Sequence, residues 1–466
     1  MDRMSTADAG FFFAEHKNVP MHVGMLSVFE GPAPSYEDFV ELIAAKLPRA
    51  PRYRQVVRTA PLHVFRPIWV DDAQFDISYH VQNVAVPAPG GTEELRKLAA
   101  KLFVHRLDQA RPLWEYWLID GLEGDRWAVL SKTHHCMVDG KGATDLMSDI
   151  FDREPDAELP ALVPWKPKPA PSAVSQAANG LWSTVTEPVG GLVTVPATVA
   201  KQLRTPRDML GFTVGMAHST QRLTSTPVTS LNGPIGPHRR WTWASAGLGE
   251  VKEIGRATGS TVNDVMLAAI TNGFRDLLQS RGELKNGVVV RALVPVSVRA
   301  EGDDDGKTNQ VTGVLVNLPV SEPDPRQRLA DVHGQMDEIK RTHQAVGADV
   351  MGKMMGFAPP TLLALGTKAS FQAPQYMLQT VATNVPGPRV PLYVLGRRML
   401  EAYPYAGIGN GIRITIAIFS YLDRFSFGIT AESRAASDLD VLIDGIHAGI
   451  AELRQSVAGA KSAHVS

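Results

Sequence analysis

Cysteine is almost absent from this sequence, since its 466 residues include only Cys136. A single cysteine cannot form an intramolecular disulfide, which excludes a disulfide scaffold and is consistent with a reducing, cytoplasmic compartment. An excess of charge of one sign is also absent, because 47 basic residues face 48 acidic ones for a formal net charge of −1. The chain therefore has no overall electrostatic attraction to nucleic acid.

Long apolar runs are missing as well. The apolar patch at residues 11–13 is bracketed by Asp8 and Glu15, and a secretory signal needs an apolar stretch of roughly 7–15 residues. The uncharged stretch at 369–388 is interrupted by prolines, glutamines and an asparagine, whereas a spanning helix needs about 20 mostly apolar residues. We expect a soluble, cytoplasmic protein, which does not exclude contact with a membrane surface.

Proline is concentrated in one place. The composition, with 44% hydrophobic and 20% charged residues, is that of a globular protein, and the length suits two or three cores. Between Pro155 and Pro171, repeated prolines remove backbone donors and favour extended backbone. We interpret this segment as the start of a connecting region. The sequence thus predicts an N-terminal half over 1–154, a connecting region over 155–231 and a C-terminal half over 232–466.

Helix and strand signals alternate in both halves. Apolar residues at helical spacing predict helices at 36–47, where Ser35 can cap the start, and at 143–151, 261–281 and about 438–457. Short runs rich in β-branched or apolar residues predict strands at 127–130, 288–296, 311–318, 412–419 and 425–430. This pattern indicates a mixed α/β fold in two halves.

The string from His134 to Gly140 lies between a predicted strand and a predicted helix, so it occupies a turn at the rim of a sheet. An imidazole with an ordinary pKa near 6.5 can take a proton from a hydroxyl at neutral pH, which makes His135 a candidate base. Asp139 can orient the turn, and Gly140 allows a tight bend or a close ligand. By spacing alone, a polar turn with satisfied hydrogen bonds explains this string as well as a catalytic base does.

Metal binding is the weaker interpretation of these histidines. Neighbouring residues of a strand point to opposite faces, and the sequence has no second ligand cluster such as His-Glu-x-x-His. Cys136 lies inside the string, and we interpret it as a packing residue. We therefore expect no bound metal and no resident cofactor.

The string matches the His-His-x-x-x-Asp-Gly signature of CoA-dependent acyltransferases, which include chloramphenicol acetyltransferases and peptide-synthesis condensation domains. The whole chain resembles the bacterial wax ester synthase/diacylglycerol acyltransferase family, especially the triacylglycerol synthases of actinobacteria. Further matching strings are spread along the chain: Asp8–Phe11, Pro20–Gly24, Pro112–Glu115, Ile119–Leu122, Leu231–Arg240, Val262–Val265, Pro295–Arg299 and Thr383–Pro388.

The resemblance implies a fold and a reaction. The fold would be two chloramphenicol-acetyltransferase-like subdomains, with mixed sheets and flanking helices, around a central channel. His135 would be the general base that removes the proton of the acceptor hydroxyl, which attacks the thioester of acyl-CoA without a covalent acyl-enzyme. His134 and Asp139 would support the turn, and Gly140 would keep the site open. The acceptor would be diacylglycerol, giving triacylglycerol, with long-chain alcohols giving wax esters as a second activity.

Three further residues are candidates for substrate binding. Asn263 would be a polar partner from the second half, with a helix-start cap beside Asp264 as the alternative. Arg239 and Arg240 would meet the phosphates of the co-substrate acyl-CoA, with a solvated basic pair as the alternative. Pro386 and Gly387 are expected to shape a loop.

The lipid acceptor implies peripheral contact with the inner membrane face or with lipid droplets. The apolar region 181–216 is a candidate contact surface, and a linker packed on the enzyme is the alternative. Two other functions stay open: a condensation-type acyltransferase that uses a carrier-protein thioester, and a non-catalytic lipid-binding protein of the same fold. The preferred acceptor, the acyl chain length and the oligomeric state do not follow from the sequence.

Overall fold

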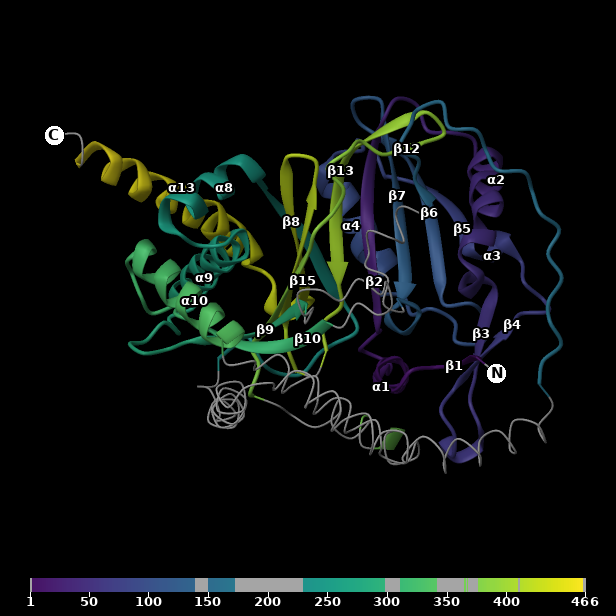
Figure 1. The fold of residues 1–466 in the computed structure, drawn as a ribbon, viewed down its shortest axis with the longest axis horizontal. Helices are drawn as coiled ribbons and strands as arrows, with labels where there is room; N and C mark the ends of the chain where they lie inside the picture. The colour runs from purple at the N-terminus through teal and green to yellow at the C-terminus, as the bar shows by residue number, and fades with distance from the viewer. Residues whose placement is uncertain are drawn as a thin grey trace.

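The computed structural model describes residues 2–138, 150–171, 229–297, 311–341, 364–365, 367, 376–409 and 411–463. Two mixed sheets stand beside each other at the centre, and helices cover their outer faces (Figure 1). This is the mixed α/β architecture in two sheet-rich parts that the sequence predicts.

The first sheet has, among the described residues, the strand order β12-β13-β2-β7-β6-β5. Its strands are β2 (His22–Glu30), β5 (Val81–Ala85), β6 (Trp114–Leu122), β7 (Arg126–His134), β12 (Tyr393–Val394) and β13 (Arg397–Ala406). Helices of this part are α1 (Thr6–Ala14), α2 (Tyr36–Lys46), α3 (Ile77–His80) and α4 (Thr92–Val104). A small sheet of β1 (Asp2–Arg3), β4 (Ile68–Asp71) and β3 (Gln55–Arg58) lies next to them.

The second sheet has the order β10-β9-β11-β14-β15-β8. Its strands are β8 (Arg239–Gly247), β9 (Val290–Ser297), β10 (Val311–Leu318), β11 (Thr380–Val385), β14 (Ile414–Tyr421) and β15 (Arg424–Glu432). The outer face is covered by α8 (Leu248–Thr258), α9 (Val262–Ser280), α10 (Pro325–Arg341) and α13 (Leu439–Ala463) (Figure 1). The apolar inner sides of these helices and one face of the sheet form one continuous core.

The predicted elements that fall on described residues are present. Ser35 caps α2, since its hydroxyl accepts a hydrogen bond from the Asp38 N–H at 3.0 Å. Thr261 and Asp264 form a capping box at the start of α9. Residues 157–171 contain no helix or strand, as the proline spacing predicts. The helix expected at 143–151 lies outside the described residues except for its last two positions.

The two sheets share chain segments. β13 pairs antiparallel with β2, with Tyr403 opposite Leu26, so a strand from late in the chain completes the sheet of the first half. Figure 1 shows this green strand beside the purple β2. The division of the chain at residue 232 therefore does not coincide with the division between the sheets.

Aromatic side chains fill the space between the sheets. Trp243 of β8 stacks on Tyr403 of β13 with ring centroids 4.2 Å apart. Phe103 of α4 stacks on Tyr405 at 4.0 Å, and its ring also meets Trp241 edge-on at 5.2 Å. Because these rings come from both sheets and from α4, they hold the two sheets in one fixed relation.

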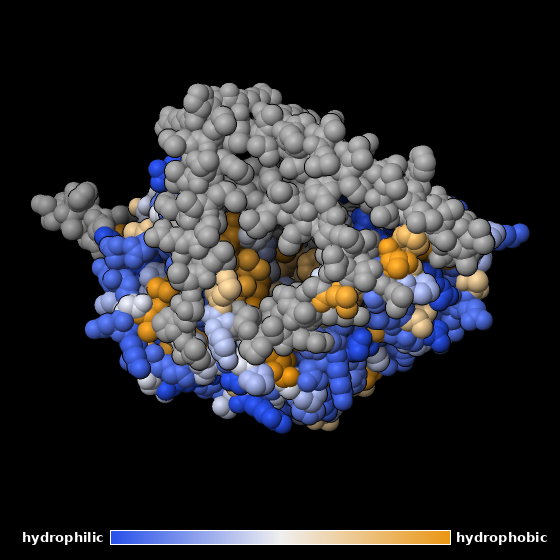
Figure 2. All heavy atoms as spheres, turned by 90° about the horizontal axis from the view of Figure 1, so that it is seen from below, coloured by the Kyte–Doolittle hydropathy of each residue, from blue (hydrophilic) through white to orange (hydrophobic). Residues whose placement is uncertain are grey.

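No helix within the described residues combines the length and apolar character needed to cross a membrane. Seen from below, hydrophobic residues gather around a recess near the centre of the surface (Figure 2).

Candidate active site

The two histidines of the string lie where β7 ends. His134 is the last residue of β7 and is paired in register with His22 of β2. His135 begins a single turn of 3-10 helix over His135–Met137. Its backbone N–H donates a hydrogen bond to the carbonyl of Met21 at 2.7 Å, which ties the turn to the segment before β2. The chain therefore leaves the sheet between the two rings.

His134 is a buried residue whose Nδ1 is hydrogen-bonded and whose Nε2 lies near a carboxylate without a hydrogen bond. Its Nδ1 accepts a hydrogen bond from the Cys136 N–H at 3.1 Å, and its side chain is fully buried. Because a backbone N–H can only donate, Nδ1 carries no proton and Nε2 carries the ring proton. That Nε2 lies 3.5 Å from Oε2 of Glu15. The hydrogen bond at Nδ1 ties His134 to the turn, and its supporting role in catalysis stays a prediction.

His135 is half-buried and differs in its surroundings. Its ring stacks on Phe11 of α1, with centroids 3.8 Å apart and planes 20° apart. Burial lowers the pKa of the His135 imidazole to about 4, although a hydrogen bond with its own backbone acts in the opposite direction. The ring is therefore neutral at physiological pH and can accept a proton.

Glu15 is a residue at this site that the sequence did not suggest. It follows α1 directly, and its side chain is fully buried. Burial alone would raise the pKa of the Glu15 carboxyl, but contacts with His134, the Met21 N–H and Arg106 lower the pKa to about 2. The available signal was a charged residue after the apolar run 11–14, and charge alone does not identify the partner of a carboxylate.

Cys136 packs inside the protein. It is 1% exposed, and burial raises the pKa of its thiol well above the usual range. The thiol therefore does not become the thiolate that nucleophilic catalysis requires. Asp139 and Gly140 lie outside the described residues, so their predicted roles stay predictions.

The side chain of Asn263 contacts a residue of another string, Thr383–Pro388. Nδ2 of Asn384, in β11, donates to Oδ1 of Asn263 at 3.2 Å. The start of α9 is capped by Thr261 and Asp264, so the Asn263 side chain is not the cap. Its role in substrate binding stays a prediction.

Arg239 is buried, and its side chain is hydrogen-bonded to backbone carbonyls. Its guanidinium donates to the carbonyls of Gly236, His238 and Asn18, the last in the segment between α1 and β2. Burial lowers the pKa of the Arg239 side chain. These contacts connect the start of the second half to the loop that leads into β2.

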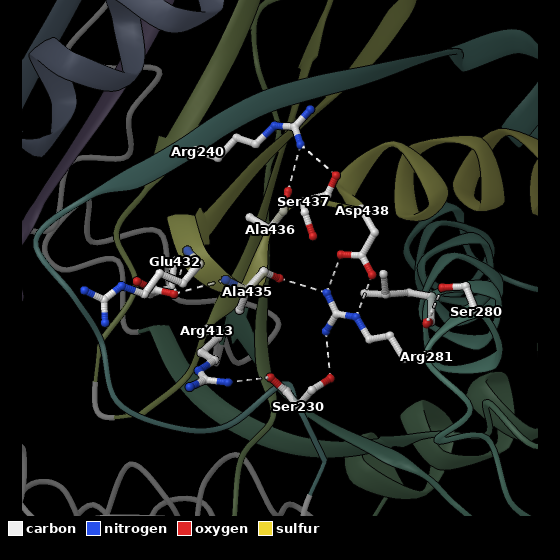
Figure 3. A network of polar contacts seen from close by, with 12 residues as sticks. Ser230, Arg240, Ser280, Arg281, Arg413, Glu432, Ala435, Ala436, Ser437 and Asp438 are labelled. Carbon is white, nitrogen blue, oxygen red and sulfur yellow. Dashed lines mark hydrogen bonds and ion pairs between the residues drawn. The ribbon is translucent and has the colours of Figure 1, made fainter.

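Arg240 lies at the surface near the start of α13. It donates to the carbonyls of Ala436 and Ser437, at 2.7 and 3.3 Å, and pairs with Asp440 at 3.2 Å. Figure 3 shows it beside a second arginine, Arg281, which grips Asp438. The predicted contact of Arg239 and Arg240 with CoA phosphates stays a prediction.

Within the described residues, no cluster of three or more His, Cys, Asp and Glu side chains is arranged to hold a metal ion.

Comparison of the sequence with known protein families identifies the family of this chain. The sequence model of the "Wax ester synthase/diacylglycerol acyltransferase catalytic domain" matches residues 4–266, and the model of the "WS/DGAT C-terminal domain" matches residues 307–454. The chain belongs to this family.

Individual members of the family are similar to this acyltransferase over nearly its whole length. The protein named "Probable diacyglycerol O-acyltransferase tgs1" from Mycobacterium tuberculosis H37Rv is 36% identical over 455 residues, covering 97% of this chain and 96% of that protein. The solved wax ester synthase/diacylglycerol acyltransferase from Marinobacter aquaeolei VT8 has a TM-score of 0.67 and 25% identity, covering 98% of this chain and all of that one.

A more distant structure shares the fold. The first condensation domain of the calcium-dependent antibiotic synthetase has a TM-score of 0.60 at 14% identity, with 97% of each chain covered. The resemblance to acyltransferases and condensation domains that the motif implies is thus confirmed at the level of fold and family.

Two of the strings on which the family resemblance rests contact the histidine turn. Residues 8–11 lie on α1, and residues 20–24 include Met21, which accepts the His135 N–H. Asn18, just before them, donates from Nδ2 to the carbonyl of Ile235 in the string 231–240. Gly387 donates its N–H to the Ser420 hydroxyl at 3.0 Å, and a Cβ there would overlap the Ser420 carbonyl. As predicted, Gly387 shapes a loop.

Proposed function

We propose that this protein transfers a long-chain acyl group from acyl-CoA to the free hydroxyl of diacylglycerol, forming triacylglycerol, and that long-chain alcohols serve as second acceptors, giving wax esters. The observation that carries the proposal is the neutral, half-buried His135 imidazole at the end of β7, in a chain of this acyltransferase family.

The proposed reaction is a direct transfer. His135 takes the proton of the acceptor hydroxyl while the oxygen attacks the thioester carbonyl and the carbon–sulfur bond breaks. The proton then passes from the imidazolium to the departing thiolate, so that CoA leaves as the thiol and the ester is the only other product. A general base of this kind contributes roughly 10²–10⁴-fold to the rate. Orientation of the two substrates must supply much of the remainder.

The lowered pKa of His135 has two consequences for its role as a base. It keeps the ring in its proton-accepting form throughout the physiological range. It also makes the imidazolium costly, which favours rapid release of the proton to the thiolate. The base is therefore restored to its neutral form at the end of each transfer.

The other predicted residues have supporting roles in this proposal. His134 and Asp139 maintain the turn, and Gly140 leaves room at its end. Asn263 binds substrate from the second half, and Arg239 and Arg240 meet CoA phosphates, with acyl-CoA entering the channel from one side and the acceptor from the other. Acyl-CoA acts as a co-substrate in a site that needs no resident cofactor.

The lipid acceptor also leads us to propose peripheral contact with a membrane or a lipid droplet. Exposed apolar side chains support it, since Leu162 and Val163 of the proline-rich segment are 58% and 59% exposed. The region 181–216, predicted as a contact surface, lies outside the described residues.

Incubation of the purified protein with radiolabelled acyl-CoA and diacylglycerol tests the function. We expect labelled triacylglycerol, a smaller yield of wax ester when a long-chain alcohol competes, and loss of both products in His135→Ala. No triacylglycerol above background, with transfer from a carrier-protein thioester instead, would establish the condensation-type reaction. Lipid binding without any transfer would establish a non-catalytic lipid-binding protein.

A further inference from the structure

The helix α1 lies at the end of the first sheet, where β7 terminates and the histidine turn begins (Figure 1). Phe11 and Glu15 are four residues apart, so they lie on one side of this helix and its end. Phe11 stacks on the ring of His135, and Glu15 approaches the ring of His134. One short element thus contacts both histidines.

Within the described residues, the recorded hydrogen-bond partners of the Glu15 carboxylate are all donors. Oε1 accepts from Arg106 Nε at 3.1 Å, from Arg106 Nη2 at 2.9 Å and from Gln109 Nε2 at 3.0 Å. Oε2 accepts from the Met21 N–H at 3.0 Å and faces the protonated Nε2 of His134 at 3.5 Å. A carboxylate accepts at all of these positions, whereas an amide would place its own N–H₂ against one of the donors.

The same carboxylate is compatible with the proton position on His134. Because Nδ1 of that ring accepts the Cys136 N–H, the ring proton must lie on Nε2, which is 3.5 Å from Oε2 of Glu15 and makes no hydrogen bond at that distance. An acceptor at Glu15 fits this tautomer, and a donor at that position conflicts with it. The Glu15 charge is balanced by Arg106, so the histidine does not need to be protonated.

The carboxylate is connected to His135 through the backbone. Met21 donates its N–H to Glu15, and the carbonyl of Met21 accepts the N–H of His135. Glu15 therefore holds His135 by two routes, one through the ring of His134 and the Cys136 N–H, the other through Met21. Both routes end on the backbone from which the His135 ring extends.

We propose that Glu15 is a positioning residue of the acyl transfer, whose carboxylate fixes the His134 tautomer and the Met21 backbone and through them the direction of the His135 ring. The inference rests on the proposed function, in which His135 is the base. Glu15 itself does not touch the substrate. A displacement of about 1 Å at a reacting group can lower the rate about 100-fold. We therefore expect loss of this carboxylate to lower kcat.

The test compares Glu15→Gln with Asp438→Asn in the acyl-CoA and diacylglycerol assay. Asp438 is a partly buried carboxylate that grips Arg281 at 2.6 and 2.7 Å in the second half, and among its contacts in Figure 3 none is a histidine. We expect Glu15→Gln to lower kcat about 100-fold with KM within about threefold. We expect Asp438→Asn to keep kcat within twofold. A kcat of Glu15→Gln within threefold of wild type, or an equal loss in both variants, would overturn the proposal.

A second measurement does not depend on catalysis. In protein labelled with ¹⁵N-histidine, and assigned by a His134→Gln variant, wild type should show a His134 imidazole with an unprotonated Nδ1 and a protonated Nε2. Glu15→Gln should show a mixture of protonation forms at this ring, and Asp438→Asn the wild-type signal. An unchanged His134 signal in Glu15→Gln would contradict the role of Glu15.

The two measurements separate this inference from the proposed function. If wild type makes no ester, the proposed function fails, and the imidazole spectrum still decides whether Glu15 fixes His134. If His135→Ala is as active as wild type, the assignment of the base is wrong, and so is a positioning role directed at it.

Discussion

Asn384, in β11, donates a hydrogen bond from its side-chain Nδ2 to Oδ1 of Asn263, on the first turn of α9, over 3.2 Å. The two residues are 121 positions apart in the chain. Each residue belongs to a different string on which the family resemblance rests, 262–265 for Asn263 and 383–388 for Asn384. The hydrogen bond between them brings these two strings into contact. Because Thr261 and Asp264 already cap α9, the pair is available for a role other than helix capping.

Replacement of Asn263 by alanine tests whether it binds substrate. We expect KM for one of the two substrates to rise about fivefold, since a neutral hydrogen bond contributes about 1 kcal/mol, with kcat little changed. Asn272→Ala is the matched control, because Asn272 lies on the same helix and donates to the Gly445 carbonyl at 2.9 Å. Initial rates with each substrate varied give both constants. Equal KM values in the two variants would show that Asn263 is structural.

Helices were predictable from sequence because their signals are local. The Ser35 cap and the apolar spacing after it place α2 to within one residue of its end, and the same holds for the start of α9 at Thr261. The pairing of β13 with β2 was not predictable in this way. Tyr403 lies opposite Leu26, and no residue near either strand specifies a partner so far along the chain.

The candidate site shows the same limit. Spacing could not separate a satisfied polar turn from a catalytic base, and the structure shows that the two histidines differ in their surroundings, while the role of His135 as the base stays a proposal. His134 makes the polar turn, and His135 presents the stacked ring with the lowered pKa. Glu15 stayed hidden because its partner Arg106 is 91 residues away and reaches it only in the fold.

Arg240→Gln tests the predicted contact with CoA phosphates. Arg240 can reach such a phosphate only by giving up part of its pairing with Asp440, which is 68% exposed. We expect KM for acyl-CoA to rise about tenfold, as for loss of a charge-assisted hydrogen bond, with KM for diacylglycerol unchanged. The increase should shrink at high salt.

Arg239→Gln is the companion variant, and it should lower stability in addition to weakening the proposed phosphate contact. Its guanidinium is committed to three backbone carbonyls, so its loss should lower the unfolding midpoint in urea. A selective effect of Arg239→Gln on KM for acyl-CoA, with none from Arg240→Gln, would place the phosphate contact at the buried arginine instead.

The pKa of His135 predicts how stability depends on pH. The folded value of about 4 lies below the ordinary 6.5, so the unfolded chain binds the proton more readily between these values. Stability is therefore complete above pH 6.5 and falls as the pH drops toward 4, by roughly 3 kcal/mol for this group. His135→Gln should lose less stability over this window, as measured by urea unfolding at several pH values. His447→Gln, at an exposed position of α13, should follow the wild-type profile.

The packing of the two sheets can be tested at Gly428 of β15. A Cβ at this position would overlap the carbonyl oxygen of Pro404 in β13, so the close approach of the sheets requires a residue without a side chain. We expect Gly428→Ala to lower the free energy of unfolding by about 2 kcal/mol, within the range found for overpacked cores. Gly334→Ala is the opposite case, because Gly334 lies inside α10 with no atom within 4 Å of the added methyl. It should stabilise the protein by about 0.5–1 kcal/mol. Unfolding of Gly428→Ala at the same urea concentration as wild type would contradict this prediction. It would show that the sheets can move apart at this point without loss of stability, and that the aromatic contacts alone hold them together.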